Sequence, residues 1–142
     1  MVTAGVVYLI DRSALARMPN PVVGWVLEPL LLDRMLAVCT VTQLEVLVSA
    51  RDLAGYERDA WHLREDFRRL AIDADVQARA LDVQALLVRT SRHGCVGPRD
   101  LLIAACAEVH GATLLHYDRD FDLISKVTGQ ASLWVVPPGS VP

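Results

Sequence analysis

A chain of 142 residues has the length of one ordinary domain and can bury a core without disulfides or a structural metal. Apolar residues make up 53% of it, but no run approaches the roughly 18 uninterrupted apolar residues that a membrane helix needs, so we expect no membrane association. The formal net charge of −3 argues against a protein that coats nucleic acid by bulk attraction, so any nucleic acid must be held locally.

The N-terminus runs directly into an apolar segment, without a basic flank or a small-residue cleavage site. We therefore expect no secretory signal and a cytoplasmic protein. The three cysteines, Cys39, Cys95 and Cys106, lack the paired spacing of a zinc site and are interpreted as reduced structural thiols.

The first third of the chain alternates between strand and helix patterns. Residues 6–10 form a short apolar run rich in β-branched residues, which is typical of a strand buried on both faces. Residues 22–32 predict an apolar helix interrupted at Pro29, residues 35–41 a second strand, and residues 42–50 a further helix.

The rest of the chain continues the alternation. Apolar residues at helical spacing predict amphipathic helices over 58–71 and 75–90, and a third helix from Pro98 that Gly111 ends. Strands are predicted at 112–115 and 132–136. Strands alternating with helices predict an α/β sandwich around a mainly parallel sheet.

Acidic side chains follow the predicted strands. Asp11 comes directly after the first strand, Glu45 lies one helical turn beyond the second, and Asp118 comes just after the third. Asp100 lies in the first turn of the helix that precedes the third strand. Because ligands of open α/β sheets bind beyond the carboxyl ends of the strands, we expect these four acids to meet at one edge.

A cluster of carboxylates predicts a hard cation, since neighbouring negative charges cannot all stay ionised without one. Oxygen-only ligands favour Mg²⁺, with Mn²⁺ as a substitute. Such an ion activates water and neutralises charge on a phosphate, so the chemistry indicated is phosphodiester hydrolysis.

Each acid also has a purely structural interpretation. Thr42 and Glu45 match a capping box, Asp100 could be a favourable charge at a helix N-terminus, and Asp11 could be a turn residue. Among Asp118, Asp120 and Asp122 we expect at least one to be merely solvated. The hypothesis rests on the conjunction of the acids.

Other side chains near the acids have two interpretations each. Ser13 could bond to a carboxylate or a metal-bound water, or cap a helix. His116 could touch substrate, but a histidine that ends an apolar strand is interpreted as structural. Ala104 and Ala107 share a helix face with Asp100, where substrate or a neighbouring element could approach closely. Candidate phosphate contacts, each with a solvated surface as the alternative, are Arg17, Arg51, Arg64, Arg68, Arg69, Arg92 and Arg119.

Four segments together resemble the PIN-domain ribonucleases, and most of all the VapC toxins of bacterial toxin–antitoxin pairs. They are Leu9-Ile10-Asp11-Arg12-Ser13-Ala14-Leu15, Gln43-Leu44-Glu45, Pro98-Arg99-Asp100-Leu101-Leu102-Ile103-Ala104-Ala105 and His116-Tyr117-Asp118-Arg119-Asp120-Phe121. The resemblance covers nearly the whole chain. It implies a single PIN domain over residues 1–142, with the three-layer sandwich of that fold.

The resemblance also implies a function. It is that of a Mg²⁺- or Mn²⁺-dependent endoribonuclease, usually a homodimer, which a cognate VapB-like antitoxin holds inactive by wrapping the active-site groove. Asp11, Asp100 and Asp118 correspond to the metal ligands, and Glu45 to a residue that positions water or a second ion. Ser13 and Asp120 are supporting residues, with Asp120 competing with Asp118 for the fourth acidic role. Arg12 departs from the family, in which a small threonine or serine is common.

Two other functions fit parts of the pattern. A PIN domain could have lost its chemistry and only bind antitoxin or RNA. A phospho-accepting receiver domain also gathers acids around Mg²⁺, but it requires a lysine after a late strand, and the only lysine here is Lys126.

Overall fold

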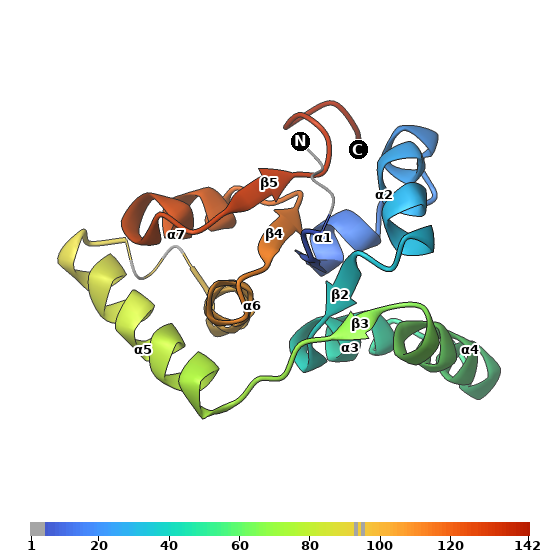
Figure 1. Ribbon diagram of the computed structural model, residues 1–142, viewed down its shortest axis with the longest axis horizontal. Coiled ribbons are helices and arrows are strands. Elements are labelled where there is room, and N and C mark those ends of the chain that lie inside the picture. Colours follow the sequence, from blue (N-terminus) through green and yellow to red (C-terminus); the bar gives the residue numbers. More distant parts are fainter. Residues whose placement is uncertain (1–4, 93, 95) are drawn as a thin grey trace.

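The structure is a computed structural model that describes residues 5–92, 94 and 96–142. Along the chain, one or two helices separate each strand from the next (Figure 1). In chain order they are β1 (Tyr8–Ile10), α1 (Arg12–Leu15), α2 (Pro21–Leu32), β2 (Leu36–Val38), α3 (Thr40–Leu47), α4 (Leu53–Glu65), β3 (Arg68–Arg69), α5 (Ala74–Arg89), α6 (Pro98–Val109), β4 (Thr113–His116), α7 (Asp120–Thr128) and β5 (Ser132–Trp134).

The described strands form one sheet in the order β3-β2-β1-β4-β5, and every neighbouring pair is parallel. The first strand in the chain, β1, is therefore central, with β2 on one side and β4 on the other. All strands point the same way, so the carboxyl ends of β1, β2 and β4 meet at one edge. This confirms the predicted α/β architecture.

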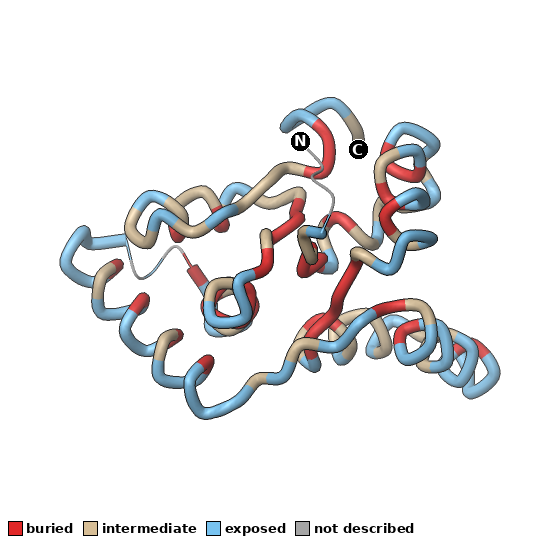
Figure 2. The backbone as a smooth tube through the Cα atoms, in the orientation of Figure 1, coloured by how far each residue is buried: buried red, intermediate tan, exposed pale blue. Residues whose placement is uncertain are grey.

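Helices cover both faces of the sheet, which gives three layers. Leu9 of β1 packs into a core that α5, α6 and α7 complete. Its neighbours Tyr8 and Ile10 point to the opposite face and pack with α1, α2 and α4. Figure 2 shows the central strands as continuously buried. Burial of each Leu or Ile side chain contributes about 1.5 to 3 kcal/mol to the free energy of folding, so the two cores hold the edge of the sheet in place.

The predicted helix over 58–71 is wrong at both ends. The Asp52 carboxylate accepts a hydrogen bond from the Gly55 N–H (2.7 Å) and starts α4 at Leu53, while α4 ends at Glu65. The chain then becomes the edge strand β3, which pairs with Ala37 and Val38. Phe67 and Leu70 still pack inward, but from either side of β3 rather than from a helix, and into opposite cores.

Two further boundaries differ from the predictions. The second strand ends at Val38 and α3 begins at Thr40, so residues 40 and 41 are helical. Helix α2 runs without a break across Pro29, which the sequence predicts as an interruption. The helix from Pro98 does end near Gly111, whose φ of 67° is the left-handed conformation that glycine adopts most easily.

Cys39 and Cys106 are buried free thiols, in agreement with their predicted structural role, and Cys95 lies outside the described residues. Within the described part of the chain, no helix is both long and apolar enough to cross a membrane.

Candidate active site

A polar cavity of about 360 Å³ opens at the carboxyl edge of the sheet. All six residues that the sequence singles out line it: Asp11, Ser13, Glu45, Asp100, Asp118 and Asp120. Five further residues complete the wall: Arg12, Ala16, Arg17, Arg99 and Tyr117. The topology thus brings together acids that lie up to 109 positions apart in the chain, from Asp11 to Asp120.

Asp11 is fixed by its backbone and by its side chain. Its N–H donates to the Leu115 carbonyl of β4 (2.9 Å), and one carboxylate oxygen accepts from the Ser13 N–H (2.9 Å). Asp11 is therefore the N-cap of the short helix α1, and only 5% of it is exposed. A buried carboxylate that also caps a helix is held in one orientation toward the cavity.

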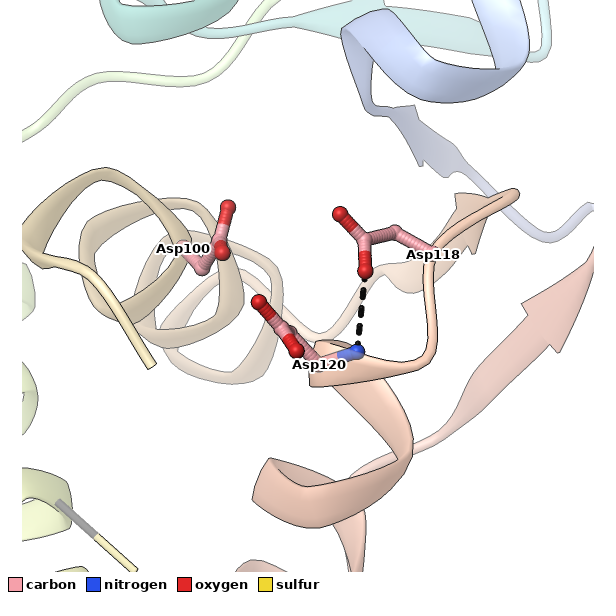
Figure 3. A group of neighbouring side chains, drawn as sticks. All are labelled: Asp100, Asp118 and Asp120. Atoms are coloured by element: carbon pink, nitrogen blue, oxygen red, sulfur yellow. Dashed lines mark hydrogen bonds between the residues drawn. The ribbon is translucent and has the colours of Figure 1, made fainter. Parts of the chain in front are cut away.

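Asp100, Asp118 and Asp120 form the tightest acidic group in the described residues. Each offers a carboxylate oxygen within 4.8 Å of the others (Figure 3). Asp118 Oδ1 accepts a hydrogen bond from the Asp120 N–H (3.0 Å), which folds the loop after β4 so that both side chains turn toward Asp100. The sequence predicts Asp11, Asp100 and Asp118 as the metal group, whereas the tightest group contains Asp120 in place of Asp11.

The crowding of charge shows in the protonation of Asp100. Burial, followed by the charges of Asp11, Asp118 and Asp120, raises its pKa to about 7. Burial and the charge of Asp118 also raise the pKa of Asp120. The raised pKa values of Asp100 and Asp120 reflect crowded negative charge, and the donor set of Asp100, Asp118 and Asp120, oxygen only, fits a hard divalent cation.

Glu45 faces the same cavity from α3. The capping box does not form, because α3 begins two residues before Thr42, which lies buried within the helix and donates to the Ile10 carbonyl (3.4 Å). Glu45 instead pairs with Arg99, with Nη1 and Oε2 3.1 Å apart. Burial raises the pKa of Glu45, while the charge of Arg99 opposes that rise.

Ser13 ties two elements together. Its hydroxyl oxygen accepts a hydrogen bond from the Tyr117 N–H (2.9 Å), so it links α1 to the loop after β4. The helix cap is Asp11 rather than Ser13. Ser13 thereby aligns the two segments that carry Asp11 and Asp118.

His116 and Asp122 have structural roles. His116 is fully buried, stacks against Phe121 and Trp134, and accepts a hydrogen bond at Nδ1 from the Asp118 N–H (3.1 Å). Both Asp122 carboxylate oxygens accept from Trp134 Nε1 (3.1 and 3.2 Å). Asp122 is thus the acid of its run that does not line the cavity.

Arginines also line the cavity, and the sequence predicts only some of them as phosphate contacts. Of the arginines predicted as phosphate contacts, Arg17 lines it and the others do not. Arg99 was not predicted, although its place beside Asp100 in the first turn of a helix is a signal that could have indicated it. Ala104 and Ala107 are buried, so they pack closely inside the protein and do not line a path for substrate.

Comparisons of the sequence with known proteins point to one family. A model of the PIN domain family matches residues 8–127. Ribonuclease VapC51 of Mycobacterium tuberculosis is 42% identical over 134 residues, which cover 94% of this chain and 96% of the relative. Ribonuclease VapC21 of the same species is 39% identical over 133 residues, covering 94% and 96% of the two chains.

Solved structures share the fold at low sequence identity. A crystal structure of VapBC2 from Rickettsia felis bound to a promoter DNA fragment matches with a TM-score of 0.72 and 16% identity, covering 91% of this chain and 98% of that one. DNA-bound VapBC from Salmonella typhimurium matches with a TM-score of 0.72 and 18% identity, covering 92% and 99%. With the family model matching most of its length and a relative above 40% identity, this chain belongs to the PIN-domain family.

Proposed function

We propose that this chain is a Mg²⁺- or Mn²⁺-dependent endoribonuclease, the toxin of a toxin–antitoxin pair, acting in the cytoplasm as one domain over residues 1–142. The observation that carries the proposal is the meeting of five carboxylates in one cavity, in a chain 42% identical to Ribonuclease VapC51. Phosphodiester hydrolysis is a reaction that such a set of acids can support with a hard cation.

The metal would be held by Asp100, Asp118 and Asp120, with Asp11 beside them. When bound, the ion would lower the pKa of water and neutralise charge that develops on the phosphate. Asp100 takes part only in its ionised form, since a protonated carboxyl is a poor ligand. The raised pKa of Asp100 therefore makes ion binding and proton release coupled events.

Glu45 is the acid best placed to handle a proton or orient water. It is separate from the tight group and keeps one carboxylate oxygen outside its pair with Arg99. Burial raises its pKa, which makes the carboxylate a stronger proton acceptor than a solvent-exposed glutamate. Arg99 would then have two roles: its ion pair orients Glu45, and its guanidinium supplies positive charge at the rim of the cavity.

A VapB-like antitoxin is the proposed inhibitor. Helices α2, α3 and α4 expose large apolar side chains, among them Trp25 (75%) and Trp61 (50%). A groove lined mainly by apolar residues, including Leu15, Leu31 and Phe67, lies between α2 and α4. Exposed apolar surface of this kind suits a partner protein, and a second copy of the chain in a homodimer would cover more of it.

Cleavage of RNA by the purified, antitoxin-free protein tests the proposal. Total RNA incubated with Mg²⁺ or Mn²⁺ should give discrete products that disappear with EDTA and with Asp11→Asn or Asp100→Asn. Asp75→Asn is the matched control, because Asp75 is also an acid in the first turn of a helix but is exposed and lies outside the cavity. Adding a VapB-like antitoxin should stop the cleavage.

Two results would contradict the proposal. Binding of RNA or antitoxin without cleavage under any metal would indicate a catalytically silent PIN domain. A stable acyl phosphate on an aspartate would indicate a receiver domain, although Lys126 lies in the last turn of α7 and does not line the cavity.

A further inference from the structure

Arg17 is the most firmly fixed cation of the cavity wall. It follows α1, is half-buried, and lines the cavity with the acids. Its Nη1 donates to the Ser13 carbonyl (2.6 Å) and its Nε to the carbonyl oxygen of Pro142 (2.8 Å). Its guanidinium lies over the ring of Tyr117, with Cζ 4.4 Å from the ring centroid. Three contacts of different kinds thus hold one guanidinium in place.

The contacts of Arg17 come from segments far apart in the chain. Tyr117 belongs to the loop that carries Asp118, and its N–H donates to the Ser13 hydroxyl. The Tyr117 hydroxyl donates to the Val141 carbonyl (2.9 Å) and accepts from the Val141 N–H (3.2 Å). Residues 141 and 142 are therefore fastened to the cavity wall by Tyr117 and Arg17, and they in turn restrain Arg17.

The other two arginines of the wall are held differently. Arg99 is 71% exposed at its side chain and already paired with Glu45, and Arg12 is exposed. A guanidinium carries five N–H donors, and Arg17 uses two of them on the Ser13 and Pro142 carbonyls. The described residues offer no acceptor to the remaining three. Arg17 therefore combines fixed position with unused donors beside an acidic cavity.

We infer that Arg17 binds substrate in this cavity, by hydrogen bonding to the RNA phosphate next to the one that is cleaved. Tyr117 and residues 141–142 position the Arg17 guanidinium for this contact. The inference rests on the proposed ribonuclease function. A planar guanidinium can give two parallel hydrogen bonds to a phosphate, and one that is already ordered loses little entropy on binding. Such a contact also offsets the repulsion between RNA and the acids.

Steady-state cleavage of a short single-stranded RNA by Arg17→Ala tests this inference. The variant should raise KM about tenfold, as expected for loss of a charge-assisted hydrogen bond, with kcat changed less than about twofold. The slope of log(kcat/KM) against log[salt] should become shallower by about 0.7, the value for one phosphate contact on a single strand. Arg17→Lys should restore KM only in part, because lysine keeps the positive charge but cannot give two parallel hydrogen bonds.

Two variants separate this role from bulk charge and from loss of folding. Arg119→Ala removes one positive charge from an exposed residue of the same loop that does not line the cavity, and should change KM less than about twofold. Tyr117→Phe keeps the ring under Arg17 but removes both bonds to Val141, and should raise KM about two- to threefold. Mn²⁺ affinity, measured by the electron paramagnetic resonance of free Mn²⁺, should match wild type in all of them.

Each other outcome overturns the inference. An unchanged KM for Arg17→Ala, an equal effect of Arg119→Ala, or a fall in kcat alone would exclude a specific phosphate contact. Loss of Mn²⁺ affinity would make Arg17 a structural residue of the metal site. Faster cleavage by Tyr117→Phe would mean that the 141–142 segment obstructs RNA. Failure of the wild type to cleave any RNA is the distinct result that overturns the proposed function, and this inference with it.

Discussion

Replacement of Asp100 by asparagine should make the metal-free protein more stable at pH 8. The pKa of this carboxyl rises from 3.8 to about 7 on folding, because it is buried among Asp11, Asp118 and Asp120. Above pH 4 the unfolded chain releases this proton, while the folded protein keeps it until about pH 7. The folded state therefore loses stability as the pH rises through that window, and it carries the full penalty above pH 7.

The size of the effect follows from the pKa. A rise of about 3 pH units corresponds to about 4 kcal/mol, and partial exposure of the side chain to water reduces the expected penalty to about 2 kcal/mol. Asparagine has the same shape without the charge, so Asp100→Asn should raise the thermal midpoint at pH 8 by about 4 to 8 °C. At pH 5 only about a third of the window has been crossed, and the gain should shrink in proportion.

Thermal unfolding with EDTA at both pH values is the assay, with Asp75→Asn as control. Asp75 also lies in the first turn of a helix, where its charge favours the helix dipole, so its replacement should destabilise by about 0.3 to 1 kcal/mol. Mg²⁺ should stabilise the wild type and leave Asp100→Asn unchanged. If Asp100→Asn is destabilised at pH 8 like the control, Asp100 is a helix-terminal charge and the reasoning fails.

Three further substitutions separate structural from chemical roles. Asp122→Asn should lower the free energy of unfolding in urea by about 1 kcal/mol, because it weakens the hydrogen bonds from Trp134. Its Mn²⁺ affinity should be unchanged, and a loss of affinity would mean that Asp122 belongs to the metal site. Ser13→Ala should cost about 1 kcal/mol, since the Tyr117 N–H loses its acceptor, and an unchanged unfolding curve would refute that role. Glu45→Gln should slow RNA cleavage at least about 100-fold, the usual contribution of a proton-transfer group, with little change in stability; normal cleavage would exclude Glu45 from the chemistry.

The parts of the fold that apolar patterns encode could be predicted. Residues 6–10 read as a strand buried on both faces, and β1 is the central strand with all three of its residues buried. The edge strand β3 carries no such signal, because Arg68 and Arg69 are both exposed and join the sheet through their main chain. Its apolar neighbours Phe67 and Leu70 happen to fall at helical spacing, which explains the overlong helix prediction.

The gathering of the acids at one edge could be predicted because parallel topology alone determines it. The finer grouping could not. Asp120 joins Asp100 because its own N–H bonds to Asp118, a turn that depends on local backbone geometry. The pair between Arg99 and Glu45 spans 54 positions, and no spacing rule connects them.

The acidic side chains repel one another, but the backbones that carry them are fixed by contacts outside the cavity. Asp11 is bonded through its main chain to β4, and Asp100 lies in the first turn of α6, whose Ile103, Ala104 and Ala107 are buried. The small side chains on that helix allow close packing beneath the site. Moving the acids apart would disrupt these cores and lower the stability of the fold by several kcal/mol. Binding of one proton at Asp100 removes a negative charge from the cluster and so relieves the repulsion without disturbing the cores. We therefore expect the repulsion within this cluster to change the protonation of Asp100 rather than to move the backbones apart.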